Sequence, residues 1–195
     1  VKMVKTMNGN VSQKTISKVY QTNVLPVILE ILLLISLGIF AIVLRSYLRI
    51  PLGIPGRHGL EFMALLIIAR RISAIPLASF IAMIGATSFM FVPFIGIKDP
   101  FLPAIYLLMG IVLDVLYFLF KNPANRLAIL SLIGGIAYMV IPLSRIVIYL
   151  FTGVLEHSFI KSGFVIPVLS HFVFGVAGAL LGAGLVYSVK RIRNK

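Results

Sequence analysis

Cysteine and tryptophan are missing from this chain of 195 residues, and only five of its residues are acidic. Without cysteine, the chain forms no disulfide, iron–sulfur cluster or thiolate zinc site. It also contains no Walker A loop, no His-Glu-x-x-His and no Gly-x-Ser-x-Gly, and its three histidines are spaced poorly for a metal site. We therefore expect a protein that is not an enzyme and that carries no metal or other cofactor.

Apolar residues dominate what is present. Hydrophobic residues make up 60% of the chain and charged residues 12%, and the mean hydropathy is +1.09. Soluble domains are about half apolar and about a quarter charged. A soluble fold of this length has too small a core to bury so much apolar surface, so we expect lipid to surround much of the chain.

Six apolar runs account for this composition. All but the second, which has about 11 residues, are long enough to cross about 30 Å of hydrocarbon as helices. The second is expected to form a short or tilted helix, because a hairpin facing lipid would leave backbone groups without partners. The runs are continuous rather than alternating, which argues against barrel strands. The sequence thus predicts an all-α, polytopic transmembrane helix bundle of about six spans, at Val24–Leu44, Gly59–Ala69, Ile72–Gly96, Phe101–Phe120, Leu127–Thr152 and Phe164–Tyr187.

The basic residues orient this bundle. The net charge of +13 sits mainly in an N-terminal segment (1–23), in a tail (190–195) and between the runs of one membrane domain (24–189). That layout is typical of topology signals and of attraction to anionic lipid, not of nucleic-acid binding. The first run is too long for a signal peptide, so we expect it to be retained as a span. By the positive-inside rule both termini are cytoplasmic, and the exceptions are Arg45, Arg49 and Arg57 in the first outer loop.

Five ionisable residues fall within the runs, where a charge costs a few kcal/mol or more and usually faces the bundle interior. Depth, counted at about 1.5 Å per residue, divides them into two sets. Glu30 and Asp114 form an inner set, expected to be structural or to contact a cytosolic partner. Glu61, Arg145 and His171 form an outer set. With their neighbours at similar depth they give a candidate solute site of Arg57, His58, Glu61, Tyr106, Arg145, Tyr149 and His171.

Two interpretations of the outer set stay open. An arginine, a carboxylate and an imidazole could fix a polar solute by charge-assisted hydrogen bonds, with aromatic side chains as walls. Alternatively, Arg145 pairs with Glu61 or Asp114 only to neutralise its charge, and His171 is a hydrogen-bonded residue of the bundle.

Small residues mark two helix faces that allow close approach of another helix. One is a stripe at four-residue spacing, Ala74, Ala78, Ala82 and Ala86, which either packs internally or docks a partner subunit. The other is Gly175, Gly178 and Gly182 on the last run, where we expect internal packing.

The segments Leu52-Gly-Ile-Pro-Gly-Arg-His-Gly59 and His171-Phe-Val-Phe-Gly175, together with the length and the alanine stripe, give the chain a family resemblance. It resembles the substrate-binding S-components of energy-coupling factor (ECF) transporters. The resemblance implies a binder of a vitamin or similar micronutrient in a prokaryotic plasma membrane, with a solute pocket beneath the first outer loop. It also implies a transmembrane coupling subunit and cytosolic ATPases as partners. One departure is that the family's small-residue motif usually lies on the first span.

The leading hypothesis is therefore a solute-binding membrane subunit of an uptake transporter. The alternative is a non-catalytic structural or accessory subunit of a larger membrane complex, in which the intramembrane charges pair internally. An intramembrane enzyme is a third class, for which the sequence gives no positive sign.

Overall fold

The computed structural model describes residues 10–48, 53–92, 99–120, 126–154 and 157–193. Within these ranges the chain forms seven helices and no strand, which confirms the predicted all-helical class. The helices are α1 (Asn10–Tyr47), α2 (Gly59–Ile72), α3 (Ala78–Met90), α4 (Leu102–Leu119), α5 (Leu127–Thr152), α6 (His157–Ser162) and α7 (Val165–Arg193).

Four of these helices are long and apolar enough to cross a membrane. The spans that qualify are Leu25–Tyr47, Leu102–Leu119, Leu127–Thr152 and Val165–Ile192. This finding indicates a membrane protein. Helix α2 has 14 residues, or about 21 Å of axis, and is the short helix expected for the second run. The prediction of about six spans goes beyond the four that meet the criterion of length and composition.

The third apolar run was predicted to be one long helix, and this prediction is wrong. The run contains the end of α2, a non-helical connection and α3, which has only 13 residues. Pro76 explains the break, because proline donates no backbone hydrogen bond and disfavours helical geometry at the residue before it. Ser73 is already extended, with φ −101° and ψ 140°. The end of the run, at 93–96, lies outside the described residues.

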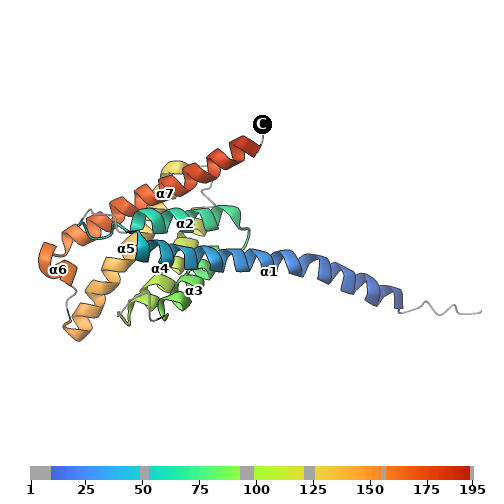
Figure 1. Ribbon diagram of the computed structural model, residues 1–195, viewed down its shortest axis with the longest axis horizontal. Coiled ribbons are helices and arrows are strands. Elements are labelled where there is room, and N and C mark those ends of the chain that lie inside the picture. The colour runs from blue at the N-terminus through green and yellow to red at the C-terminus, as the bar shows by residue number, and fades with distance from the viewer. Residues whose placement is uncertain (1–9, 49–52, 93–98, 121–125, 155–156, 194–195) are drawn as a thin grey trace, which may run out of the picture.

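Helix α2, one of the two short helices of the bundle interior, packs against more helices than any other. Helix α2 packs against α1, α3, α5 and α7, while α4 lies between α3 and α5. Most of the side chains of α2 are buried, among them Phe62, Met63, Leu66 and Ile67. The long helices surround α2 and expose large apolar side chains, as expected of surfaces that face lipid. Figure 1 shows α1 projecting beyond the bundle toward the side on which α7 ends.

Both small-residue faces pack inside the chain. On α7, a Cβ atom added to Gly178 or Gly182 would collide with the backbone of α2, which confirms the expected internal packing of the glycine face. Of the alanine stripe, Ala78, Ala82 and Ala86 are buried on α3, and Ala82 meets Gly38 of α1 without room for another carbon atom.

Ala74, the first residue of the predicted stripe, does not share the helix face of the other three, because it is an exposed residue of the connection before α3. Since its other three members are covered by this chain itself, the stripe is an internal contact in this structure. Docking of a partner on the same face would require the helices to separate.

Candidate functional site

Polar side chains inside the bundle gather in two clusters near opposite ends of α2 and of the apolar span of α1, Leu25–Tyr47. We name each cluster by its buried carboxylate. The Asp114 cluster consists of Glu30, Arg70, Ser73, Ser79 and Asp114. The Glu61 cluster consists of Arg45, His58, Glu61, Tyr106, Tyr138 and His171. Along α2, Arg70 and Glu61 are about nine residues apart, or roughly 14 Å.

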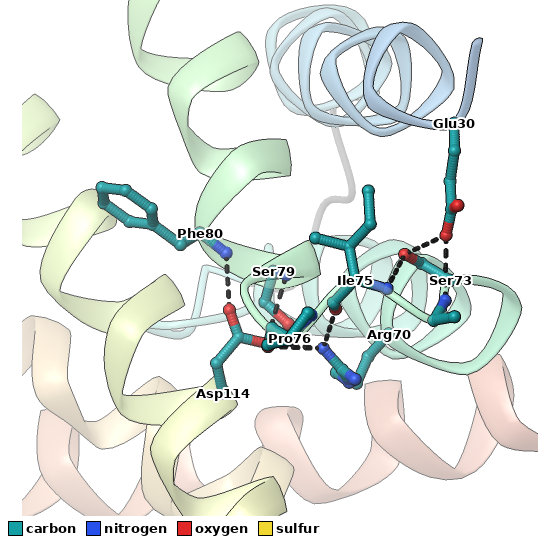
Figure 2. Close-up of polar contacts among 9 residues, drawn as sticks. Glu30, Arg70, Ser73, Ile75, Pro76, Ser79, Phe80 and Asp114 are labelled. Atoms are coloured by element: carbon teal, nitrogen blue, oxygen red, sulfur yellow. Dashed lines mark hydrogen bonds and ion pairs between the residues drawn. The ribbon is translucent and has the colours of Figure 1, made fainter. Parts of the chain in front are cut away.

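Asp114, on α4, holds the first turn of α3. Its side chain is fully buried, and its oxygens accept hydrogen bonds from the backbone N–H groups of Ser79 (3.2 Å) and Phe80 (2.9 Å). Such N–H groups have no partner within their own helix. Leu77, at the N-cap position, has no side-chain oxygen to offer them. Asp114 therefore supplies from a neighbouring helix the capping group that α3 lacks (Figure 2).

Arg70, near the end of α2, balances the charge of Asp114. Its Nη1 atom lies 3.5 Å from Oδ1 of Asp114 and donates to the carbonyl oxygens of Ile75 (2.6 Å) and Pro76 (2.7 Å). The guanidinium also lies over the ring of Tyr117, 4.7 Å from its centroid. A buried ion pair is tolerated when further hydrogen bonds satisfy its remaining groups, and these contacts do so for Nη1 of Arg70.

Glu30, on α1, holds the same connection from the other side. One of its oxygens accepts hydrogen bonds from Oγ of Ser73 (2.5 Å) and from the backbone N–H of Ala74 (2.9 Å). Oγ of Ser73 in turn accepts from the backbone N–H of Ile75 at 3.0 Å. Figure 2 shows Glu30, Arg70 and Asp114 converging on the segment between α2 and α3. The cluster thus fixes a connection, as the structural interpretation of the inner set expects.

Glu61, in the first turn of α2, is the centre of the second cluster. Its side chain is 5% exposed, and Oε1 lies 2.6 Å from Nδ1 of His58. Its other oxygen, Oε2, has no hydrogen-bond partner among the described residues, and the same holds for Nε of Arg57, one turn earlier. A buried carboxylate oxygen without a donor is costly, because it has lost water and gained nothing.

Arg45 brings the end of α1 into this cluster. Its Nη1 donates a hydrogen bond to the hydroxyl of Tyr106 on α4, and its guanidinium carbon lies 5.4 Å from the ring centroid. The ring of Tyr106 meets Phe62 of α2 edge-on at 5.0 Å between centroids. One aromatic contact therefore holds Tyr106, and both its ring and its hydroxyl contact the guanidinium of Arg45.

His171 connects α7 to the same cluster. Its Nδ1 donates to the carbonyl oxygen of Pro167 at 2.6 Å, and its ring stacks on Tyr138 of α5 with centroids 4.9 Å apart. A Cβ atom added to Gly56 would lie 2.7 Å from Nδ1 of His171. Gly56 has φ +78°, a backbone conformation that glycine adopts without strain. The loop before α2 therefore approaches the imidazole closely because residue 56 has no side chain.

Four of the seven predicted site residues come together, because His58, Glu61, Tyr106 and His171 belong to the Glu61 cluster. Arg57 directly precedes His58, and its buried Nε has no partner among the described residues. The other two lie elsewhere. Arg145, on α5, forms an ion pair with Asp99, which precedes α4. Tyr149 faces Phe164, with ring centroids 6.1 Å apart.

The sequence analysis left out two residues of the Glu61 cluster, Arg45 and Tyr138, and the partner of Arg145. Arg45 was assigned to the first outer loop and was not named as a site residue, although its position at the end of a span was a signal. Tyr138 falls in the middle of an apolar run, where a phenolic hydroxyl is unusual. Asp99 stands next to a proline in a turn-like sequence, and nothing in that pattern points to Arg145.

An apolar crevice lies apart from both clusters. Its empty volume is about 150 Å³, and it is lined by Leu37, Gly38, Ala41, Leu65, Leu66, Ala82 and Met83. Since no charged or hydrogen-bonding side chain lines it, this crevice does not suit a polar solute. Among the described residues, no group of three histidine, aspartate or glutamate side chains could hold a metal ion.

The geometry alone carries the functional argument, because the chain matches no family model, no curated protein and no solved structure.

Proposed function

We propose that this chain is a membrane-embedded solute-binding subunit of an uptake transporter, of the kind represented by the S-components of ECF transporters. Its solute is a vitamin or similar micronutrient, and its site is the Glu61 cluster. The chain crosses a prokaryotic plasma membrane about six times with both termini in the cytoplasm. A transmembrane coupling subunit and cytosolic ATPases supply the energy for uptake.

The observation that carries this proposal is the unsatisfied chemistry of the Glu61 cluster. Oε2 of Glu61 and Nε of Arg57 are buried without a partner among the described residues. The Asp114 cluster also contains buried atoms without a partner among the described residues, Nε of Arg70 and Oγ of Ser79. Its carboxylate is different, however, because both oxygens of Asp114 accept backbone hydrogen bonds. Buried polar groups are nearly always paired, and exceptions are common where a ligand completes the set. Oε2 of Glu61 is a buried acceptor of that kind, whereas an unpartnered Nε is common to Arg57, Arg70, Arg71 and Arg145.

The position of the cluster agrees with uptake. Arg45 lies at the end of α1 that is remote from the N-terminal lysines, and Glu61 lies in the first turn of the following helix. With the termini in the cytoplasm, the Glu61 cluster would sit beneath the outer headgroups. A solute arriving from outside would meet it first.

A specific observation favours a second candidate, a structural or accessory subunit of a larger membrane complex. Arg145 pairs with Asp99 and Arg70 with Asp114, so two intramembrane cations are balanced within the chain. Internal pairing of this kind is what a subunit without a transported solute requires. The unsatisfied oxygen of Glu61 favours the solute-binding function.

Purification from the native membrane in mild detergent distinguishes the two functions. We expect the chain to elute with ATPase subunits, and we expect ATP hydrolysis in the eluted complex. A stable, stoichiometric complex of other membrane proteins without any ATPase would instead support the accessory subunit.

A further inference from the structure

We propose that the ends of α2 and α7 bind the headgroup of one anionic phospholipid, with Arg71 and Lys190 as the residues that contact its phosphate. The site lies at the end of the bundle that holds the Asp114 cluster, and it does not depend on the proposed function. It follows from the register of the two helices, from an uncovered face of α7 and from the missing counter-charge of the two cations.

Helices α2 and α7 run parallel, and this places the two cations at one level. A Cβ atom added to Gly178 would meet the first turn of α2, and one added to Gly182 would meet the backbone of Ala64, further along α2. Seven residues beyond Ala64, α2 reaches Arg71, and eight residues beyond Gly182, α7 reaches Lys190. Since both helices rise about 1.5 Å per residue, Arg71 and Lys190 lie at about the same level.

Both cations lie on helix faces that pack inside the bundle. Arg71 comes four residues after Ile67, and Lys190 comes seven and four residues after Ala183 and Val186. Residues at these spacings share one face of a helix. The side chains of Ile67, Ala183 and Val186 are buried. Because the axes of packed helices are about 8–10 Å apart, the long side chains of Arg71 and Lys190 can reach a single phosphate between them.

The packed face of α7 is uncovered beyond the end of α2. Helix α2 ends at Ile72, whereas α7 continues to Arg193. Val186 is 7% exposed, but Val189, on the same face as Gly182, is 65% exposed. Among the described residues, the end of α2 and the uncovered part of α7 therefore form a step in the surface, and the two cations lie at this step.

The described carboxylates leave these cations without a counter-charge. Arg71 and Lys190 form no ion pair with any of them, and each carboxylate binds another group: Glu30, Glu61, Asp99 and Asp114. Two like charges at one level repel each other, and an anion between them replaces this repulsion by attraction to both. Guanidinium and ammonium groups both bind phosphate through charge-assisted hydrogen bonds.

Apolar side chains next to the cations favour a lipid over a soluble anion. Ile72 follows Arg71, and Val189 and Ile192 lie within two residues of Lys190; all three side chains are exposed. Lys190 also belongs to the last turn of the candidate span that ends at Ile192, where headgroups meet hydrocarbon. A phospholipid carries a phosphate beside acyl chains and matches both features, whereas a soluble anion matches the cations alone.

Native mass spectrometry of the full chain, purified and delipidated in detergent, tests the site. The chain is mixed with phosphatidylglycerol or with phosphatidylcholine that has the same acyl chains. We expect one molecule of phosphatidylglycerol to bind at least about fivefold more tightly than phosphatidylcholine, as for one further contact between a cation and an anionic lipid. Equal binding of the two lipids would overturn the site. Displacement of phosphatidylglycerol by glycerol phosphate would show that the occupant is a soluble anion.

Matched variants locate the bound lipid. Arg71→Gln and Lys190→Gln each remove one charge from the site, and each should weaken phosphatidylglycerol about fivefold. Arg191→Gln removes the same charge at the same end of the bundle. Arg191, however, comes four residues after Tyr187, on an exposed face of α7, so we expect its replacement to leave the affinity unchanged.

Two outcomes for these variants would overturn the site. Equal weakening by all three would mean that the lipid responds only to the net charge of this end, and no weakening by Arg71→Gln and Lys190→Gln would place it elsewhere. An unchanged temperature of thermal unfolding shows that each variant is folded. Glu61→Gln should retain the lipid, which separates this added mass from that of a solute in the Glu61 cluster.

Discussion

At the scale of single residues, Asp114 both caps a helix and forms a buried ion pair. Its carboxylate caps α3 through the N–H groups of Ser79 and Phe80, and it also pairs with Arg70. The negative charge suits both tasks, because the N-terminus of a helix carries partial positive charge. The position of α3 therefore depends on a residue of α4.

Replacement of Asp114 should therefore be severe. Asp114→Ala removes the cap and leaves the guanidinium of Arg70, which is 6% exposed, without its counter-charge. We expect a loss of about 3–5 kcal/mol in the free energy of unfolding, as for other broken buried pairs. Thermal unfolding of the purified chain in detergent measures this loss.

Glu30→Ala is the matched control for this variant. Glu30 also binds a backbone N–H, but it is only half-buried and its partner Ala74 is exposed. We expect a loss of no more than about 1 kcal/mol, close to that of an ordinary hydrogen bond. If the two variants lost the same free energy of unfolding, the contacts of Asp114 would contribute no more to stability than those of Glu30.

The sequence allowed the residues of the site to be predicted in part. Counting residues from the ends of the apolar runs separated Glu30 and Asp114 from Glu61 and His171, because helix rise is regular. The partners of Arg145 and Glu61 could not be predicted in this way. They depend on how helices rotate and on which loop residues, such as Asp99, approach a helix end.

At the scale of helices, small residues determine how closely two helices pack. Gly38 of α1 faces the backbone of Ala82 on α3, and Gly182 of α7 faces the backbone of Ala64 on α2. In lipid, where apolar surface gains nothing from leaving its solvent, close backbone approach supplies much of the attraction between helices. These glycines are therefore positions of contact, and their role is not flexibility.

A single added methyl group tests this account. Gly38→Ala places a Cβ atom against the backbone of α3, so the helices must separate, and we expect a loss of about 1–3 kcal/mol in the free energy of unfolding. Gly184→Ala is the control on a helix face, because nothing lies within 4 Å of its Cβ position. Chemical unfolding in mixed micelles compares the two variants. A loss from Gly184→Ala that matches the loss from Gly38→Ala would mean that close approach is not what glycine provides at position 38.

The bounds of the helices could be predicted where one apolar run forms one helix. They could not be predicted where an apolar run contains a non-helical connection. Helices α4, α5 and α7 begin within about one residue of the predicted runs. The third run failed, because the residues around Pro76 are apolar although the chain turns there. Glu30 on α1 and Asp114 on α4 stabilise that turn together with Arg70 at the end of α2, and such tertiary contacts leave no local pattern.

At the scale of the whole molecule, a short buried helix, α2, packs against three of the four long apolar helices, α1, α5 and α7. Helix α2 begins in the Glu61 cluster and ends in the Asp114 cluster, so it links the two polar regions of the bundle. In the Asp114 cluster both oxygens of the buried carboxylate accept hydrogen bonds, although Nε of Arg70 and Oγ of Ser79 have no partner among the described residues. In the Glu61 cluster one oxygen of the buried carboxylate, Oε2, has no partner among the described residues. On this contrast we base the assignment of the solute site.

Native mass spectrometry of the purified chain tests this assignment most directly. The account predicts a population of the wild-type chain that carries one small molecule, and the loss of that added mass in Glu61→Gln but not in Glu30→Gln. A wild-type spectrum that contains only the bare chain, or an added mass that Glu61→Gln retains in full, would contradict it.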